Sequence, residues 1–169
     1  MFNDMFQQMK KQLGQLDKWL AAAEAHAEAK KFDAKSFVGM RLVVDQFAFA
    51  RQVQTACDTL KLAASRLTGK DAPSHDDKEE TLPQLRERIA STLAYLNGFS
   101  GKDFEASATR SITQPRWEGK TMTGHDYFVE HVIPNFYFHL TTAYAILRQN
   151  GVAIGKRDFL GPLTQAAPK

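Results

Sequence analysis

The stretch PNFYFHLTTAYAILRQNG, residues 134–151, reads as a helix rich in aromatic and aliphatic residues. Within it, Asn135 and His139 stand one helical turn apart, so both side chains can point at the same spot. His139 is expected to face the interior or the rim of a cavity. At about 100° per residue, four apolar side chains share one side of this helix: Phe136, Leu140, Ala143 and Leu147.

Three further helices are predicted upstream, because apolar residues recur there at steps of three and four. The first covers about residues 3–30, the second residues 41–69 and the third residues 81–97. Thr81 and Gln84 fit a capping box at the start of the third helix. Together with the last helix, these segments predict an all-α fold, an antiparallel four-helix bundle.

The connections between these helices differ in character. Residues 99–123 do not look helical and are expected to form an irregular excursion or a short hairpin between the third and fourth helices. This loop is long enough to permit a crossover, so those two helices can lie parallel. Pro134 is expected to kink or split the last helix. We expect one domain over residues 1–169, with a partly irregular tail (156–169) in which an apolar patch at Phe159 can dock back.

Composition limits the classes of function. Hydrophobic residues make up 43% and charged residues 24% of the chain, which is typical of a globular protein. No apolar run approaches the ~18 residues of a membrane span, and the N-terminus lacks the pattern of a signal peptide. The single cysteine, Cys57, fits a reducing cytoplasm. The net charge of +3 is small and scattered, so no nucleic-acid partner is expected.

Two polar residues of the predicted second helix raise the question of what they pair with. Gln46 falls within its apolar stripe and Asp45 at its edge. One interpretation is structural: a hydrogen bond to a neighbouring helix, or an ion pair with Arg41 or Arg51. His139 likewise can be a core histidine that needs one hydrogen-bond partner. The functional interpretation is that Asp45 faces His139 across the bundle, where a carboxylate and an imidazole can bind a divalent metal or move a proton.

Three stretches of the chain resemble a known family. They are DQFAFARQVQTACD (45–58), TGHDYFVEHVIPNFYFHLTTAYAILRQNGV (123–152) and GKRDFLG (155–161). The chain is similar to a bacterial branch of the DinB/YfiT-like metalloenzyme superfamily, and the resemblance extends over nearly its whole length. It implies a four-helix bundle that is commonly dimeric.

The resemblance also implies a metal site. In the superfamily, a histidine pair at positions i and i+4 precedes an LRxxG-like end of the terminal helix. Aligning AILRQNG with that end places His139 on the second histidine and Asn135 on the first. The third histidine comes from the second helix, where this chain offers Asp45 or Gln46. Characterised members include metal-dependent thiol transferases and hydrolases, whereas here two of the three expected ligands are replaced.

Three hypotheses of function follow, and none assigns a catalytic residue. In the first, the ancestral metal site is degenerate, and its pocket binds a small molecule or belongs to a homodimeric module. The residues expected to line that pocket are Asp45, Gln46, Asn135, His139, Tyr127 and Tyr144. In the second, Asp45, Asn135 and His139 hold a divalent metal for a transferase or hydrolase, with nickel, manganese or iron better suited than zinc. In the third, the protein is a regulatory interaction protein without a small-molecule site.

Overall fold

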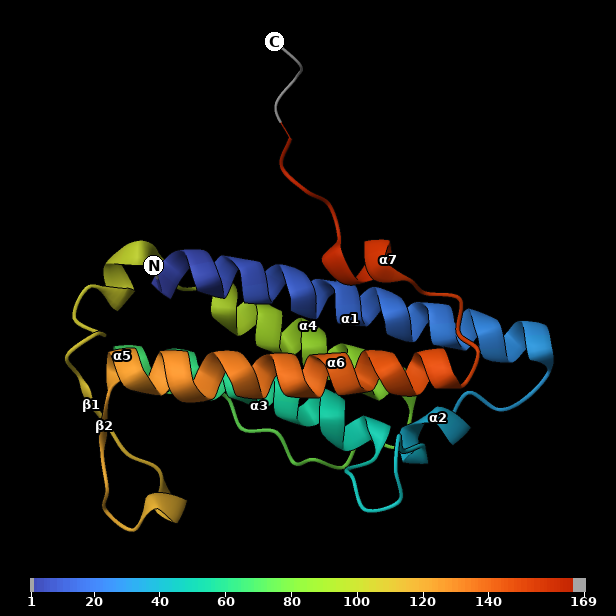
Figure 1. The fold of residues 1–169 in the computed structure, drawn as a ribbon, viewed down its shortest axis with the longest axis horizontal. Coiled ribbons are helices and arrows are strands. Elements are labelled where there is room, and N and C mark those ends of the chain that lie inside the picture. The colour runs from blue at the N-terminus through green and yellow to red at the C-terminus, as the bar shows by residue number, and fades with distance from the viewer. Residues whose placement is uncertain (1, 166–169) are drawn as a thin grey trace.

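The computed structural model describes residues 2–165, and four long helices packed side by side make up most of it (Figure 1). The long helices are α1 (Phe2–Lys30), α3 (Phe49–Thr68), α4 (Leu82–Asn97) and a composite that joins α5 (Gly124–Asp126), a π-helical turn (Tyr127–Val132) and α6 (Ile133–Gln149). We call this composite the last helix. The short elements are α2 (Ser36–Gly39), two 3-10 helices (Gly101–Phe104 and Pro115–Trp117), β1 (Ser111–Ile112), β2 (Met122–Thr123) and α7 (Lys156–Leu160). The predicted four-helix bundle is confirmed, as is the hairpin between the third and fourth helices.

Contacts between side chains define the direction of each helix. α1 runs parallel to the last helix, since Phe6 stacks on Phe128 at a ring distance of 5.3 Å and Trp19 meets Tyr144 at 5.4 Å. These rings belong to one continuous apolar core inside the bundle, in which Trp19 is 1% exposed. Burying a large apolar side chain of this kind stabilises the fold by about 1.5–3 kcal/mol. Among the helices of residues 2–165, none combines the length and the hydropathy that a transmembrane span requires.

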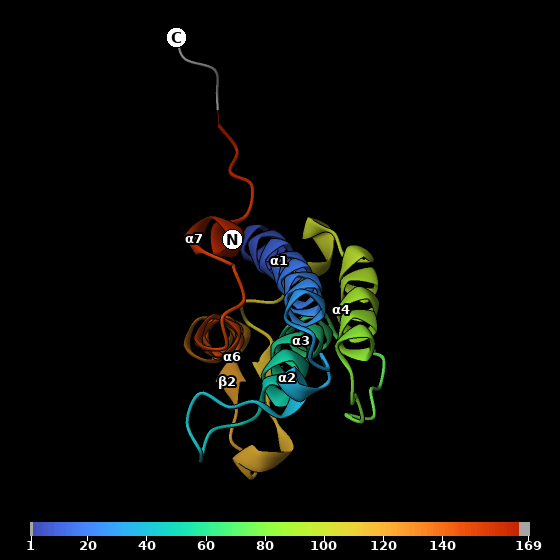
Figure 2. The ribbon, with the colours of Figure 1, turned by 90° about the vertical axis from the view of Figure 1, so that its right-hand side faces the viewer.

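The crossover connection lies between the second and third long helices, not between the third and fourth. Arg88 of α4 pairs with Asp58 of α3, and Tyr95 is hydrogen-bonded to Ser65 about two turns further along both helices. α3 and α4 are therefore parallel. Residues 69–81 run back along the bundle to join them, as Figure 1 shows, and the end-on view of Figure 2 shows α3 between α6 and α4. The other long helices are antiparallel to this pair, so the hairpin excursion needs no crossover.

The second long helix begins later than its amphipathic pattern predicts. Residues 41–48 form a loop, and α3 starts at Phe49, so the predicted start at residue 41 is wrong. The backbone N–H of Phe49 donates to the carbonyl of Met40 at 2.8 Å, which folds the intervening residues out of the helix. Arg41 closes the same loop by donating to the Gln46 carbonyl. The Val-Val pair in this loop has only modest helix propensity, so tertiary contacts decide its conformation.

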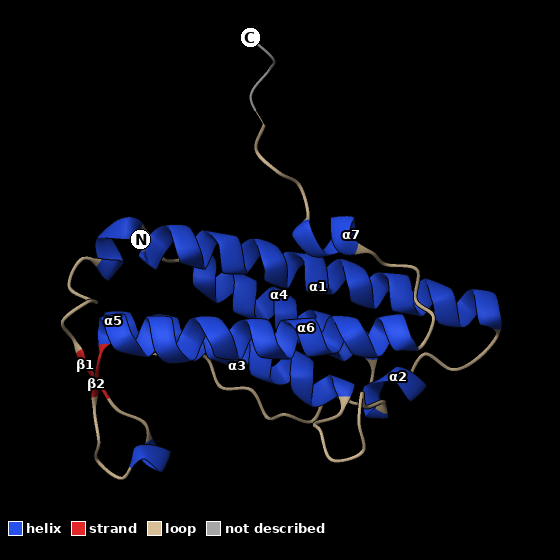
Figure 3. Ribbon diagram, viewed as in Figure 1, coloured by secondary structure: helices blue, strands red, loops and turns tan. Residues whose placement is uncertain are grey.

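The last helix begins at Gly124, directly after the stretch 99–123 that is expected not to be helical, and Pro134 does not split it. Thr123 caps its start by accepting from the backbone N–H of Asp126 at 3.1 Å. Proline lacks an N–H, and its ring clashes with the carbonyl four residues earlier. The turn before Pro134 is π-helical, with the Ile133 N–H bonded to Phe128, and this wider turn accommodates the ring. The helix therefore continues as one rod from α5 to α6 (Figure 3).

The tail docks on the outside of the bundle, as predicted. Phe159 of α7 stacks on Trp19 with ring centroids 5.4 Å apart, and its edge meets Tyr144 at 5.5 Å. The indole N–H of Trp19 donates to the carbonyl of Asp158 at 3.2 Å. Residues 166–169 of the predicted tail lie outside the described part of the chain.

Candidate functional site

Polar side chains form a seam along the contact between α3 and the last helix. On α3 they are seven residues apart, a spacing that keeps them on one face toward a partner helix. Each meets a polar side chain of the last helix, and together they define the polar seam. The pairs are Gln52 with His139 (Oε1 to Nδ1, 2.7 Å), Thr59 with Asn135 (Oγ1 to Nδ2, 2.7 Å) and Arg66 with Tyr127 (Nη1 to OH, 3.0 Å).

The π-helical turn sets the register of the last helix along this seam. Tyr127, His131, Asn135 and His139 are each four residues apart. In an α-helix, each step of four rotates the side chain by about 40°, so four such positions would spiral off one face. A π turn holds more residues per turn and rotates the series back. The first three residues thereby line one pocket next to α3, and π turns of this kind are frequent at functional sites.

His139 is buried, and its hydrogen bond fixes its tautomer. It is 6% exposed. The Gln52 amide nitrogen donates to the carbonyl of Phe47 at 2.9 Å, which turns the amide oxygen toward His139 Nδ1. Nδ1 therefore carries the proton and Nε2 does not. Burial, and secondly the positive charge of Arg51, lower the pKa of His139 to about 4, so the imidazole is neutral at pH 7.

This neutral histidine should make stability depend on pH. Below pH 6.5 the unfolded chain protonates His139, whereas the folded chain resists protonation down to about pH 4. The free energy of unfolding should therefore fall as the pH drops through this window, by an amount of the order of 2–3 kcal/mol. Urea unfolding of the wild type and of His139→Gln at pH 7 and pH 4.5 measures the effect. The stability gap between them should narrow at pH 4.5; an unchanged gap would contradict the assignment.

Next to the seam is a pocket of about 360 Å³ between α3, the last helix and the β1–β2 excursion. We call it the hairpin pocket. Its polar lining comes from three elements that are distant in sequence. α3 supplies Arg51, Thr55, Asp58, Thr59 and Arg66, the excursion supplies Gln114 and Arg116, and the last helix supplies Tyr127, His131 and Asn135. The chain thus gathers cationic groups and hydrogen-bonding groups around one cavity.

The structure places two of the predicted pocket residues in the hairpin pocket. These are Asn135 and Tyr127. His139 lies one turn further along the seam, where Gln52 binds it, and does not line the cavity. Tyr144 points toward α1 instead, where its ring meets Trp19.

Asp45 and Gln46 are displaced by the late start of α3. Asp45 is exposed on the loop of residues 41–48 and Gln46 is half-buried there. Among the described residues, Asp45 makes no hydrogen bond or ion pair with His139, whose side-chain partner is Gln52. The prediction that Asp45 and Gln46 stand on a helix facing His139 is therefore wrong.

The donor groups at the seam do not fit a catalytic metal. His139 can supply one nitrogen and Asn135 one amide oxygen, whereas a catalytic zinc site uses three protein ligands. Within residues 2–165, no three His, Cys, Asp or Glu side chains come together as a metal site. The position that faces His139 is occupied by the amide of Gln52.

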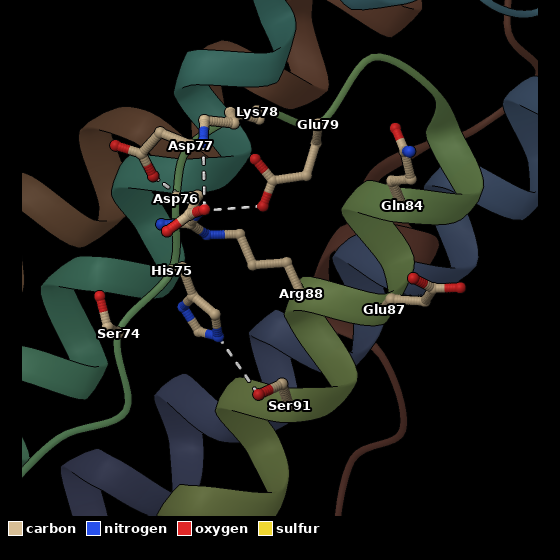
Figure 4. A pocket seen from close by; sticks show the side chains of 10 residues that line it. All are labelled: Ser74, His75, Asp76, Asp77, Lys78, Glu79, Gln84, Glu87, Arg88 and Ser91. Atoms are coloured by element: carbon tan, nitrogen blue, oxygen red, sulfur yellow. Dashed lines mark hydrogen bonds and ion pairs between the residues drawn. The ribbon is translucent and has the colours of Figure 1, made fainter.

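A second pocket, of about 430 Å³, lies between residues 74–79 and α4 (Figure 4). His75 Nε2 is 3.2 Å from Ser91 Oγ, and His75 Nδ1 is 2.9 Å from Lys61 Nζ. Because an ammonium group only donates, Nδ1 is the acceptor and Nε2 carries the proton. His75 therefore donates to Ser91 and cannot act as a general base on it. Around Arg88 the same pocket holds a cluster of ion pairs, which indicates that this region stabilises the fold.

The fold is that of a DinB-like helical bundle. The chain belongs to the DUF1993 family, a domain of unknown function whose model matches residues 1–160. It is similar to a DinB family member protein from Shewanella denitrificans, known from a crystal structure, with 52% sequence identity and a TM-score of 0.94. That match covers 99% of this chain and 98% of the other. No curated protein matches the chain. The resemblance to the DinB superfamily is thus confirmed.

The sequence analysis does not predict several residues of the polar seam and the hairpin pocket. Gln52, Thr59 and Arg66 carry a detectable pattern, since polar residues recur every seven positions inside an otherwise apolar stripe. Arg116 carries no such pattern, because only the fold brings the excursion next to α3.

Proposed function

We propose that this protein binds a small molecule in the hairpin pocket. The observation that carries the proposal is the convergence of polar groups from three elements on one cavity of about 360 Å³. Small-molecule sites typically measure about 300–1,000 Å³ and place a few polar groups among apolar walls. The volume is at the lower end of this range, which favours a small ligand.

Hydrogen bonds of the polar seam fix the orientation of an amide group that lines the hairpin pocket. Asn135 donates its amide N–H to Thr59 Oγ1, and the Thr59 hydroxyl donates to the carbonyl of Thr55 at 2.7 Å. This chain of bonds orients the Asn135 amide and leaves its oxygen without a donor among the described residues. A ligand hydroxyl or amide N–H can fill that position, which supports a binding role.

Binding can be tested with a library of small neutral, cationic and anionic fragments and the ¹H–¹⁵N NMR spectrum of the protein. We expect fragments to shift the amide signals of Thr55, Thr59, Tyr127 and His131. Thr55→Trp, which fills the pocket, should abolish these shifts, whereas Thr141→Trp, on an exposed turn of α6, should keep them. Shifts confined to the pocket beside Arg88, or an absence of shifts, would overturn the proposal.

We further propose a cytoplasmic homodimer. The absence of any cysteine other than Cys57 supports the cytoplasmic location.

Exposed apolar side chains support self-association: Val44 is 92% exposed and Phe47 56% exposed on the loop before α3, and Phe138 is 54% exposed on α6. Light scattering should give twice the 19.0 kDa mass of one chain; a monomeric mass at micromolar concentration would contradict the dimer.

A further inference from the structure

We infer that the ligand of the hairpin pocket carries a carboxylate or phosphate group, held by the guanidinium groups of Arg66 and Arg116 and by the amide N–H of Gln114. This inference rests on the proposed binding function and adds the chemical class of the ligand. The recognised feature is an oxyanion, and three observations on the lining residues support it.

The first observation is that the negative charge of the one carboxylate described in the pocket lining is neutralised by cations outside the pocket. Among the described lining residues, Asp58 is the only carboxylate. Its Oδ1 lies 2.9 Å from Nη2 of Arg88 on α4 and 2.9 Å from Nζ of Lys61 on α3, and neither cation lines the pocket. Arg51 pairs with Asp77 of the crossover loop. Asp58 is thus balanced by cations outside the pocket, and Arg51 has its own counter-ion.

The second observation is that the remaining two arginines have neutral partners. Arg66 Nη1 donates to the hydroxyl of Tyr127 at 3.0 Å, and Arg116 Nη2 lies 3.1 Å from His131 Nε2. Neither pairs with a carboxylate among residues 2–165. A guanidinium group carries five N–H donors in a planar fork that matches carboxylate and phosphate oxygens. Each arginine therefore keeps both its charge and free donors for a ligand.

The two charges act on the same part of the pocket. Burial lowers the pKa of His131, and the positive charges of Arg116 and then Arg66 lower it further. His131 is therefore neutral at pH 7 and its Nε2 accepts from Arg116. Positive potential concentrated in a cleft attracts anions. Oxyanion binding would offset the repulsion between the two guanidinium groups.

The third observation is an unpaired donor in the lining. Gln114 is 8% exposed, and its amide nitrogen is buried without a hydrogen-bond acceptor among the described residues. Buried donors are rarely left unpaired, and each unpaired case calls for an explanation. Gln114 stands two residues before Arg116 on the excursion and lines the same cavity. An oxyanion oxygen is an acceptor for both side chains.

Calorimetric and NMR titrations at low salt test the inference with four probes: inorganic phosphate, phenyl phosphate, benzoate and neutral benzyl alcohol. We expect at least one anion to bind and benzyl alcohol to bind at least about tenfold more weakly, because a hydrogen bond to a charged group contributes a factor of about 10–100 in affinity. The comparison of phenyl phosphate with benzoate identifies which oxyanion the pocket prefers.

Variants locate the binding groups. Arg116→Gln, on the exposed excursion, should weaken anion binding about tenfold or more, and adding Arg66→Gln should weaken it about a hundredfold. Arg157→Gln, on the exposed surface of α7, removes the same charge far from the pocket and should leave affinity unchanged. Equal losses in Arg157→Gln and Arg116→Gln would overturn the inference.

The neutral and anionic probes test the oxyanion inference and the proposed binding function separately. If neutral fragments or benzyl alcohol shift the pocket signals as strongly as the anions do, the oxyanion inference is wrong and small-molecule binding stands. If no fragment and no probe shifts these signals, both are wrong.

Discussion

Replacing Arg88 with methionine is expected to lower the free energy of unfolding by about 3 kcal/mol, because it removes a buried cation that three partly buried carboxylates share. The Arg88 side chain is 1% exposed. It lies 2.9 Å from Asp58 Oδ1, 2.7 Å from Asp77 Oδ1 and 2.9 Å from Glu79 Oε1. Methionine retains much of the apolar stem, so the loss should reflect the missing charge and hydrogen bonds.

The size of this effect follows from the topology. α3 and α4 are parallel, so residues 69–81 must run the length of the bundle without regular structure. Arg88 fastens this connection through Asp77 and Glu79, and Gln54 adds a hydrogen bond to Glu79 at 2.8 Å. Losing the arginine should release residues 69–81 from the bundle and leave Glu79 without its ion pair, whereas Asp58 keeps Lys61 and Asp77 keeps Arg51.

Urea unfolding of Arg88→Met beside Arg86→Met measures the difference. Arg86 stands on the same helix and also forms ion pairs, with Asp17 and Glu24, but its side chain is 37% exposed. Exposed ion pairs contribute at most about 1 kcal/mol each. A loss in Arg88→Met no larger than that in Arg86→Met would show that the cluster does not hold the loop.

The sequence predicts the parts of this fold that depend on local chemistry. The capping box of Thr81 and Gln84 begins α4 as expected, and Thr123 caps the last helix. The inward orientation of His139 follows from its helical position, because one face of that helix is apolar. Each of these features depends on residues within a few positions of one another.

The features that sequence did not predict depend on distant contacts. The amphipathic pattern before Phe49 is compatible with a helix, but the bond from Phe49 to Met40 folds those residues into a loop. This single difference removes Asp45 from the site and leaves Gln52 opposite His139. In the hairpin pocket, Arg66 and Arg116 come together only because the excursion packs beside α3. Local spacing carries no information on that approach.

Gly124→Ala is expected to destabilise the protein by about 3 kcal/mol, because the first turn of the last helix has no room for a methyl group. A Cβ atom at Gly124 would lie 1.9 Å from the carbonyl oxygen of Ser107 and 3.0 Å from Leu67 Cδ2. Neighbouring bonds hold this contact in place: the His125 N–H donates to the Ala108 carbonyl at 3.0 Å, and the Ser107 hydroxyl donates to the Leu67 carbonyl at 2.9 Å. The backbone on both sides is therefore fixed.

Gly14→Ala provides the matched control, because a Cβ at Gly14 meets nothing within 4 Å and the residue lies inside α1. There alanine should stabilise the fold by about 0.5–1 kcal/mol through its higher helix propensity. Thermal and urea unfolding compare the two variants; if Gly124→Ala is as stable as the wild type, the close approach is wrong. Since Tyr127 stands three residues after Gly124 and binds Arg66 at 3.0 Å, a displaced first turn should also weaken oxyanion binding in the hairpin pocket. Gly14→Ala should leave that binding unchanged, so the two glycines separate the geometry of the pocket from the general stability of the bundle.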